Sequence, residues 1–336
     1  MIGYYVHHHG RGHLARTTSI CAQLDQPVTV LTSLPLGEQT PFDEVLPLPR
    51  DDGGGPAVDP TASDVFHWVP LHHDGLRERM RLIADWITVA RPAAFVVDVS
   101  VEVATLVRLL GVPVVVVAMP GERTDRPHEL VYELADHIVA AWPRALYQPD
   151  WLRRHDHKTS YVGGISRFEG RPRPVRRDDG ACRVLTLGGA GGSTVDAAMI
   201  DRYAADHPRF RWNALGVAGG RWIDDPWDDL CDADVVVAHA GQSSIADIAT
   251  AARPAIVVPQ LRPFAEQETT AGVLGRSGLA VSLRRWPESP EWDELIDRAL
   301  RLDPEAWRRW QTAGAPARAA AQIDEVAARR APVSVP

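Results

Sequence analysis

Short apolar runs alternate with amphipathic segments along most of the chain. The runs are rich in β-branched residues and bounded by turn residues, which is typical of strands buried on both faces of a parallel sheet. In the first half the predicted strands are Ile2–Val6, Val28–Leu31, Phe95–Val99, Val114–Ala118, Ile138–Ala141 and Tyr161–Ile165. Apolar positions at helical spacing predict helices over residues 14–24, Leu76–Ala90, Val101–Leu110 and His128–Ala135. Strands that alternate with helices predict an α/β fold with a doubly wound, mostly parallel sheet.

The same alternation starts again in the second half. The predicted strands are Arg183–Leu187, Phe210–Leu215, Val235–Ala238 and Ala255–Val258, and an amphipathic helical region covers Trp292–Val326. Each half opens with a strand, a glycine-rich turn and a helix, as in two facing Rossmann-like domains with a cleft between them. We predict an acceptor-side domain over residues 1–165, a linker over 166–180, a donor domain over 181–305 and a helical tail over 306–336. The linker is rich in proline and charge, and the tail could pack back on the first domain.

One segment does not fit the alternation. Leu34–Val65 is rich in proline, glycine and aspartate and contains the glycine run of Asp51–Pro56. Long loops in compact domains often serve function. We therefore interpret this segment as a long excursion over the cleft.

Composition narrows the class of protein. A length of 336 residues suits two domains of ordinary size. A formal net charge of −8 gives no electrostatic reason to expect nucleic acid as a partner. The three cysteines, Cys21, Cys182 and Cys231, are scattered without a metal-binding spacing, so we expect reduced thiols and a cytoplasmic protein.

Membrane insertion is not expected. The chain has no apolar stretch of about 18 residues, so the sequence predicts no transmembrane segment. The stretches Val65–Leu71 and Arg77–Trp86 are apolar enough to leave a peripheral membrane contact open.

The first glycine turn has two competing interpretations. Gly10-Arg11-Gly12-His13-Leu14-Ala15 formally matches a dinucleotide-binding turn after a strand. The acidic residue that would bind the ribose is missing after the second strand, in Leu31–Pro35, so a dinucleotide site is disfavoured. His13 at the carboxyl edge of the sheet is better placed for chemistry than for packing.

The histidines near this turn also raise the question of a metal. His7, His8, His9 and His13 carry imidazoles, which are common zinc ligands. Strand alternation should turn His8 away from its neighbours, and no local cysteine or carboxylate completes a tetrahedron. We therefore expect no metal site.

Two further glycine turns lie in the second half. The run Gly188–Thr194 can bring backbone amides close to a phosphate, but it lacks the lysine of a P-loop, so ATP hydrolysis is disfavoured. In the stretch Ala233–Ala271, a strand ends at His239-Ala240-Gly241, and a helix follows with Ser243 and Ser244 in its first turn. Free amides at a helix N-terminus favour an anion.

Together these motifs resemble the GT-B nucleotide-sugar glycosyltransferases, especially the type that makes the lipid-linked peptidoglycan precursor and its relatives that glycosylate small molecules. The resemblance covers nearly the whole chain. Its most specific motifs follow one another in the family's order: Trp222–Asp225, Ala233–Gly241, Ile245–Ala249, Arg253–Pro259 and Glu266-Gln267.

The resemblance implies roles for the donor side. The backbone at Ile223 would meet the nucleobase, and Asp247 would bind the ribose hydroxyls. His239 and the amides from Gly241 to Ser244 would hold the diphosphate. Glu266 and Gln267 would bind the hydroxyls of the donor sugar. The donor-binding residues expected on this basis, together with the glycine run, are Gly188, Gly189, Ile223, His239, Gly241, Gln242, Ser243, Ser244, Asp247, Glu266 and Gln267.

On the acceptor side, Gly10, Arg11 and Gly12 resemble the family's glycine-rich turn. His13 would be the general base, and Asp98, which ends a strand of the same sheet, would orient it. Arg11 or Arg16 could add positive charge near the leaving diphosphate, so the reaction would need neither a metal nor a cofactor.

We therefore expect an inverting, metal-independent transfer of a sugar from a UDP- or dTDP-sugar to a hydroxyl of a small-molecule or lipid-linked acceptor. Two alternatives remain open at this point. The first is a nucleotide-sugar hydrolase or epimerase on the same scaffold, because the first glycine turn also resembles that of sugar-nucleotide hydrolases. The second is a non-catalytic protein that binds a nucleotide sugar.

Overall fold

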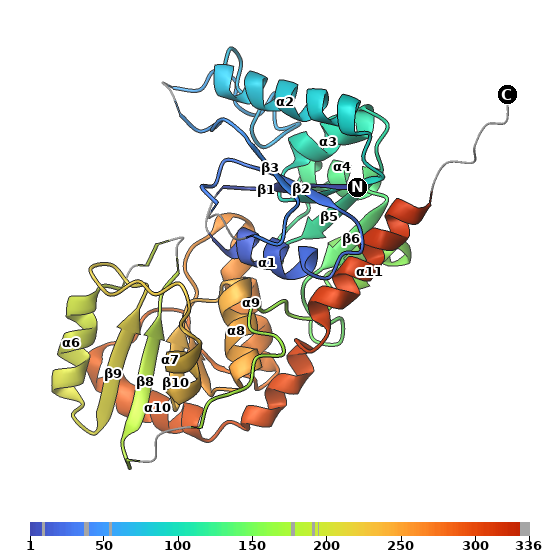
Figure 1. Ribbon diagram of the computed structural model, residues 1–336. Helices are drawn as coiled ribbons and strands as arrows, with labels where there is room; N and C mark the ends of the chain where they lie inside the picture. Colours follow the sequence, from blue (N-terminus) through green and yellow to red (C-terminus); the bar gives the residue numbers. More distant parts are fainter. Residues whose placement is uncertain are drawn as a thin grey trace, which may run out of the picture.

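The computed structural model describes residues 1–8, 11–36, 40–53, 56–175, 179–189, 192–193 and 195–329. The chain forms two α/β domains, one above the other in Figure 1, each built on a parallel sheet. The predicted fold class, two doubly wound Rossmann-like domains, is confirmed.

The first sheet has the strand order β3-β2-β1-β4-β5-β6-β7. Its strands are β1 (Ile2–Val6), β2 (Val28–Thr32), β3 (Glu44–Pro47), β4 (Ala94–Asp98), β5 (Val114–Ala118), β6 (His137–Ala140) and β7 (Thr159–Tyr161). On one face lie α2 (Asp74–Ala90), α3 (Val101–Leu109) and α4 (Arg126–Leu134), and on the other lie α1 (Gly12–Cys21) and α11 (Ala315–Ala328). The two short helices α5 (Asp150–Arg153) and η1 (Asp156–Lys158) precede β7. Buried valines of the central strands fill both faces, as the apolar runs predicted.

The second sheet has the order β12-β11-β10-β8-β9. Its strands are β8 (Cys182–Leu187), β9 (Phe210–Leu215), β10 (Val235–Ala238), β11 (Ala255–Val257) and β12 (Val281–Ser282). The helices α7 (Trp227–Asp232), α8 (Gln242–Ala251) and α9 (Glu266–Arg276) cover one face, and α6 (Ala197–Asp206) and α10 (Trp292–Leu300) the other. Three 3-10 helices, η2 (Pro263–Ala265), η3 (Ser289–Glu291) and η4 (Pro304–Trp310), complete this half.

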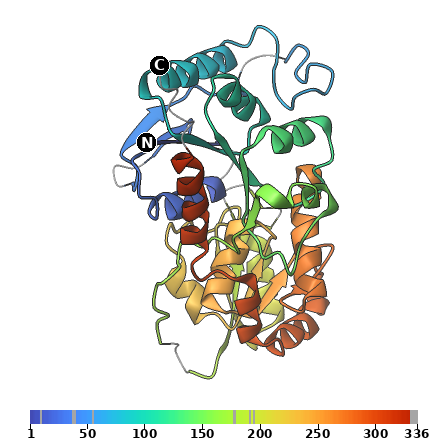
Figure 2. The ribbon, with the colours of Figure 1, turned by 90° about the vertical axis from the view of Figure 1, so that its right-hand side faces the viewer.

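The last helix returns to the first domain. Three residues on one face of α11, Ala315, Ala319 and Ile323, are fully buried against α1 and the first sheet. Figure 2 shows α11, in dark red, beside the blue α1. The chain therefore crosses between the domains twice, once at the linker and once after η4.

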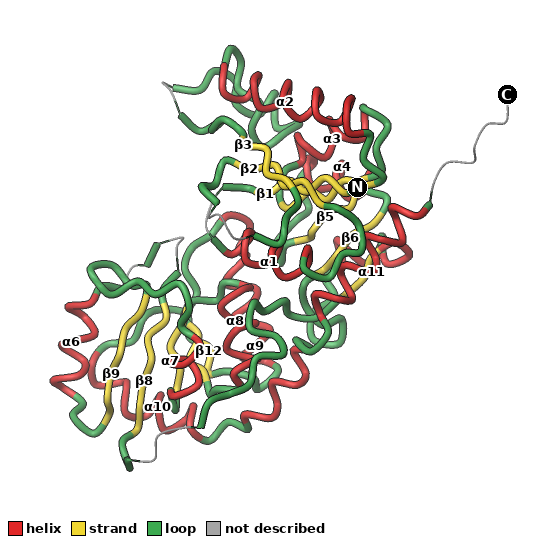
Figure 3. The backbone as a smooth tube through the Cα atoms, in the orientation of Figure 1, coloured by secondary structure: helices red, strands yellow, loops and turns green. Residues whose placement is uncertain are grey.

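Three predicted segments differ in the structure, and α7, α9 and β12 were not predicted at all. The excursion from Leu34 to Val65 contains the edge strand β3, although most of it is loop (Figure 3). The last strand of the first sheet ends at Tyr161 and not at Ile165, because Gly163 has a φ of +83° and Gly164 donates its N–H to the Trp310 carbonyl of η4. The helical region Trp292–Val326 is three separate pieces, α10, η4 and α11.

Candidate functional site

A cavity of about 700 Å³ lies between the two domains, at the carboxyl ends of their central strands. This is the position at which open α/β sheets bind ligands. Every donor-side residue predicted from the sequence lines it: Gly188, Gly189, Ile223, His239, Gly241, Gln242, Ser243, Ser244, Asp247, Glu266 and Gln267. From the first domain, Arg11, Gly12 and His13 line it as well, whereas Gly10 lies outside the described residues.

His13 and Asp98 are brought together by strand register. β1 and β4 are parallel neighbours in which Val6 is paired with Asp98, so β4 ends beside the turn that leads from β1 into α1. His13 is the second residue of α1, and its Nδ1 lies 2.9 Å from Oδ1 of Asp98. Asp98 is fully buried behind the histidine and does not line the cavity. The pair that the sequence predicted therefore exists as a hydrogen-bonded pair.

Asp98 has a second partner, Arg16, and the sequence did not predict this contact. Arg16, which was expected to add charge near a diphosphate, lines the cavity, and its buried guanidinium also bonds Asp98 at both oxygens, with Nη2 2.6 Å from Oδ1 and Nε 3.1 Å from Oδ2. Burial alone would raise the pKa of Asp98, but the charge of Arg16 and the contact with His13 outweigh it and hold that pKa below its ordinary value. Asp98 is therefore a carboxylate at neutral pH.

The N-termini of α1 and α8 face each other across the cavity. The hydroxyl of Ser243 donates to the carbonyl of Gly12 at 3.1 Å, and a Cβ on Gly12 would lie only 3.1 Å from that hydroxyl. The N-cap of α8 is Gly241, which has no side chain to accept from the first amides of the helix. Those amides are therefore available to an anion bound in the cavity.

His239 sits at the end of β10 with both ring nitrogens engaged. Nδ1 lies 2.9 Å from the carbonyl oxygen of Val258, and Nε2 lies 3.0 Å from the hydroxyl of Ser193. Burial lowers the pKa of His239, which favours the neutral ring. A neutral ring that donates from Nδ1 can only accept at Nε2, so His239 needs a proton, or Ser193 as an intermediary, to donate to a phosphate.

Asp247 is nearly fully buried on α8. Its oxygens accept from the Ser166 hydroxyl at 2.7 Å and from Nε of Arg167 at 3.1 Å, both at the start of the linker. Burial raises the pKa of Asp247 to about 6, against the opposing charge of Arg167. A carboxylate has about four acceptor positions, so a ribose would share Asp247 with the linker.

Glu266 and Gln267 open α9, and their position depends on the first domain. Phe264, just before them, has a φ of +61° and accepts the N–H of Glu122 with its carbonyl at 2.7 Å. Gly121, with a φ of +108°, permits this approach, because a Cβ there would lie 2.2 Å from the Phe264 oxygen. The Gln267 side-chain oxygen is occupied by the backbone N–H of Gln260, which leaves its NH₂ group to face a ligand.

Three arginines of the site were not predicted. Arg123 lies 3.6 Å from the Glu266 carboxylate, Arg167 lines the cavity, and Arg262 lines it on the donor side. Arg123 follows β5 and Arg167 follows β7. The one signal in the sequence that could have predicted them is their position shortly after the end of a strand. Arg11, which was predicted, bridges to Asp224 at 2.9 Å at the edge of the cavity.

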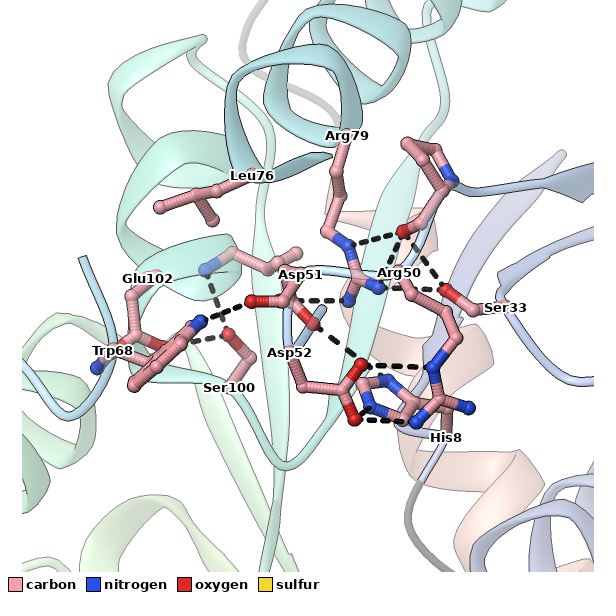
Figure 4. Close-up of polar contacts among 12 residues, drawn as sticks. His8, Ser33, Arg50, Asp51, Asp52, Trp68, Leu76, Arg79, Ser100 and Glu102 are labelled. Atoms are coloured by element: carbon pink, nitrogen blue, oxygen red, sulfur yellow. Dashed lines mark hydrogen bonds and ion pairs between the residues drawn. The ribbon is translucent and has the colours of Figure 1, made fainter. Parts of the chain in front are cut away.

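A polar network holds the excursion against the same edge of the sheet. Figure 4 shows Asp52 between His8 and Arg50, and Asp51 beside Arg79. His8 lines the cavity, with its Nε2 3.2 Å from Asp52, and the fully buried Arg79 lies 3.2 Å from Asp51. The excursion therefore contacts the wall of the cavity through His8.

The prediction that strand alternation turns His8 away from its neighbours is wrong. The strand β1 ends at Val6, and the ring of His7 stacks on that of His8 with centroids 4.7 Å apart. His9 lies outside the described residues.

In the ranges that the structure describes, two clusters have the composition of a metal site. The possible ligand atoms of His67, Asp125 and His128 lie within 4.8 Å of one another, as do those of His8, Asp51 and Asp52. In the first cluster, Nη1 of Arg123 lies 3.2 Å from Nε2 of His128. The guanidinium of Arg123 is a donor, so Nε2 of His128 has to accept. A metal bound at Nδ1 would instead leave a proton on Nε2, facing the N–H of Arg123. The arrangement therefore fits a hydrogen-bonded cluster better than a set of metal ligands. In the second cluster, the carboxylates already pair with Arg50 and Arg79.

Sequence comparison adds to this geometry. Residues 211–314 match the profile of the glycosyltransferase family 28 C-terminal domain. A protein of Sorangium cellulosum, named UDP-N-acetylglucosamine--N-acetylmuramyl-(pentapeptide) pyrophosphoryl-undecaprenol N-acetylglucosamine transferase, is 29% identical over 54% of this chain and 49% of its own length. Its namesake in Acidiphilium cryptum is 30% identical over 44% of this chain and 45% of its own. The chain thus matches these relatives over about half of their length.

Solved structures extend the similarity to the whole fold. The glycotransferase of kitacinnamycin has a TM-score of 0.67 and 16% identity, covering 97% of this chain and 98% of its own. The calicheamicin glycosyltransferase CalG4 has a TM-score of 0.66 and 18% identity, covering 98% and 99%. MurG of Acinetobacter baumannii has a TM-score of 0.59 and 13% identity, covering 96% and 99%. The fold is GT-B, and the predicted resemblance to the glycosyltransferases of the peptidoglycan-precursor type is confirmed.

The described part of the chain contains no helix with the length and apolar character that a bilayer crossing requires.

Proposed function

We propose that this protein is a glycosyltransferase that moves a sugar from a UDP- or dTDP-sugar to a hydroxyl of a small-molecule or lipid-linked acceptor, with inversion and without a metal. The observation that carries the proposal is the position of the His13–Asp98 pair, which faces the uncapped N-terminus of α8 across one cavity. The similarity of residues 211–314 to the glycosyltransferase family 28 C-terminal domain supports the same assignment.

In the proposed reaction the donor diphosphate lies on the first amides of α8. Amides at a helix N-terminus favour an anion, and Arg11 and Arg262 on the cavity wall add positive charge. This charge takes the place that a divalent metal would otherwise fill as the diphosphate leaves. Asp247 would bind the ribose, Glu266 and Gln267 the sugar, and the backbone at Ile223 the base.

His13 would act on the acceptor. The acceptor hydroxyl gives its proton to Nε2 of His13 while its oxygen forms a bond to the anomeric carbon, and the bond to the diphosphate breaks with its electron pair. Asp98 holds the Nδ1 proton of His13 and stabilises the imidazolium that forms. Attack from the side opposite the diphosphate inverts the anomeric centre.

Titration calorimetry with a panel of UDP- and dTDP-sugars tests the donor assignment. We expect binding by at least one nucleotide sugar, and transfer when candidate acceptors are added. The anomeric configuration of the product, read by proton NMR, tests inversion, and turnover in excess EDTA tests metal independence. Failure of every nucleotide sugar to bind the folded protein would refute the proposal.

Two outcomes would replace the proposal with its alternatives. Rapid, stoichiometric release of free sugar and nucleotide without an acceptor would indicate a hydrolase. Tight donor binding with no turnover, unchanged in His13→Ala, would indicate a non-catalytic binding protein. For a transferase, we expect His13→Ala to abolish turnover and to leave the donor Kd nearly unchanged.

A further inference from the structure

Arg16 contacts both halves of the site. It lies one turn after His13 on α1, and its side chain is only 4% exposed. Two of its nitrogens bond the two oxygens of Asp98, and the third, Nη1, donates to Oε1 of Gln242 across the cleft at 2.9 Å. One guanidinium therefore connects the buried carboxylate with the first residue of α8.

The contact with Asp98 determines which nitrogen of His13 carries the proton. Two groups lie near Nδ1 of His13: Oδ1 of Asp98 at 2.9 Å and Nη2 of Arg16 at 3.1 Å. Nη2 donates to Oδ1 of Asp98 at the shorter distance of 2.6 Å, and an ionised carboxylate can only accept hydrogen bonds, so Nδ1 of His13 donates to Asp98. This leaves the lone pair of Nε2 free to take a proton. If Asp98 were protonated, it could donate to Nδ1 and place the ring proton on Nε2, where it would block a base.

Few other charges contact this carboxylate. The groups facing Asp98 are Arg16 and His13 from α1 and Tyr4 from β1, and Glu266 acts on Arg16 and His13 from across the cleft. Tyr4 is neutral, because burial raises its pKa. Among the residues that the structure describes, Arg16 is the buried cation that keeps Asp98 ionised.

The contact with Gln242 extends this arrangement to the donor side. Since the Gln242 oxygen accepts from Arg16, its NH₂ group is turned elsewhere, and Gln242 lines the cavity at the N-terminus of α8. The same two helix ends are joined by Ser243 and Gly12. Displacement of α8 relative to α1 would thus pull on the guanidinium that fixes Asp98.

We propose that Arg16 is a positioning residue: by keeping Asp98 ionised, it fixes the tautomer of His13. Because Arg16 also bonds Gln242, the first residue of α8, this tautomer depends on the position of α8. The inference rests on the proposed function for its kinetic consequences. Arg16 and Gln242 exchange no proton in the reaction; the acceptor proton passes to Nε2 of His13 alone.

Three variants and a control test the inference by kinetics. Arg16→Met should lower kcat about 100-fold or more, since the ring proton of His13 can then move to Nε2, the nitrogen that must accept the acceptor's proton. Arg16→Lys keeps the positive charge but not the guanidinium that bonds both oxygens of Asp98, and it should lower kcat about tenfold. Gln242→Leu should lower kcat by a similar factor. The donor Kd should stay within about twofold in both Arg16 variants, because all three guanidinium nitrogens of Arg16 already bond Asp98 or Gln242. Arg171→Lys is the matched control, an arginine paired with Asp225 outside the cavity, and should leave kcat within about twofold.

Two further measurements separate positioning from general structural damage. If Arg16 and Gln242 act as one unit, Arg16→Lys combined with Gln242→Leu should be little worse than Arg16→Lys alone. In Arg16→Met, activity should rise with pH over a range where the wild type is flat, as the unpaired Asp98 ionises. Equal losses of kcat and donor affinity, or a kcat within twofold of wild type in both Arg16 variants, would overturn the inference.

The ring nitrogens of His13 give a test that needs no turnover. In protein labelled with ¹⁵N-histidine, we expect the wild-type His13 resonances to show the proton on Nδ1, and those of Arg16→Met to show it moved toward Nε2. An unchanged tautomer would refute the inference. If no nucleotide sugar binds, the proposed function fails, while this spectrum still decides the role of Arg16.

Discussion

Replacement of Asp98 by asparagine removes the centre of the site with almost no change in volume. The carboxylate accepts from His13 at 2.9 Å and from Arg16 at 2.6 and 3.1 Å, and it is fully buried. A carboxamide has one oxygen and no charge, so Arg16 is left as a buried cation without an anionic partner. Removal of one partner from a buried ion pair costs about 3 to 5 kcal/mol of folding free energy.

The same change should nearly abolish transfer. The NH₂ group of the new carboxamide can face Nδ1 of His13 and force the ring proton onto Nε2. A mis-set tautomer of this kind lowers kcat by about 10⁴-fold in the Ser-His-Asp enzymes, which corresponds to about 5.5 kcal/mol of transition-state stabilisation. We expect a loss of this order for Asp98→Asn.

Urea unfolding and initial rates at saturating donor measure the two effects. The double variant Asp98→Asn/Arg16→Met removes the stranded cation together with its partner. It should recover most of the lost stability, because a buried ion pair is often replaceable by apolar groups at little cost, but none of the activity. A single variant as stable as the wild type, or a double variant that regains turnover, would refute this reasoning.

Three other changes test other parts of the molecule. The raised pKa of Asp247, about 6, means that the folded protein binds the proton of this carboxyl more tightly than the unfolded chain does. The stabilisation that results is complete below about pH 4 and is lost as the pH rises through about 6. Asp247→Asn should therefore gain about 2.5 kcal/mol relative to the wild type between pH 4 and pH 7 in urea unfolding. A difference independent of pH would contradict the burial of this carboxyl. Gly121→Ala should destabilise the protein by about 2 kcal/mol or more and raise the donor KM, because its Cβ would lie 2.2 Å from the Phe264 oxygen just before Glu266; a KM equal to that of the wild type would refute this link. Ile323→Ala in α11 should cost about 2 to 4 kcal/mol by calorimetry, and a loss below about 1 kcal/mol would show that the helix is not part of the first core.

The sequence predicted those features that follow from strand ends and glycine turns. Val6 and Asp98 end neighbouring apolar runs, so a histidine after one and a carboxylate ending the other had to meet at one edge of the sheet. The positions of Gln242, Ser243 and Ser244 at the cavity were predictable because their helix, α8, begins directly after a buried strand. These features are local in the sequence, and the parallel sheet places them in space.

Contacts between distant segments could not be predicted in this way. The side chain of Arg16 bonds Asp98, 82 residues away, and Gln242, 226 residues away, and no pattern around Arg16 separates it from an exposed helical arginine. β3 was missed because its residues are mostly exposed at the edge of the sheet and carry no apolar run. Phe264 adopts a left-handed conformation that favours glycine, so only the contact with Gly121 and Glu122 reveals why it does so.

The return of α11 to the first domain has a consequence for biosynthesis. Its buried face completes the core below β1 and α1, which leave the ribosome before the second domain, whereas α11 follows the entire second domain. The nascent first domain must therefore wait with one side of its sheet partly uncovered until the other domain has been made. We expect this nascent intermediate to be the form most exposed to chaperones and to aggregation, since uncovered apolar surface is what both recognise.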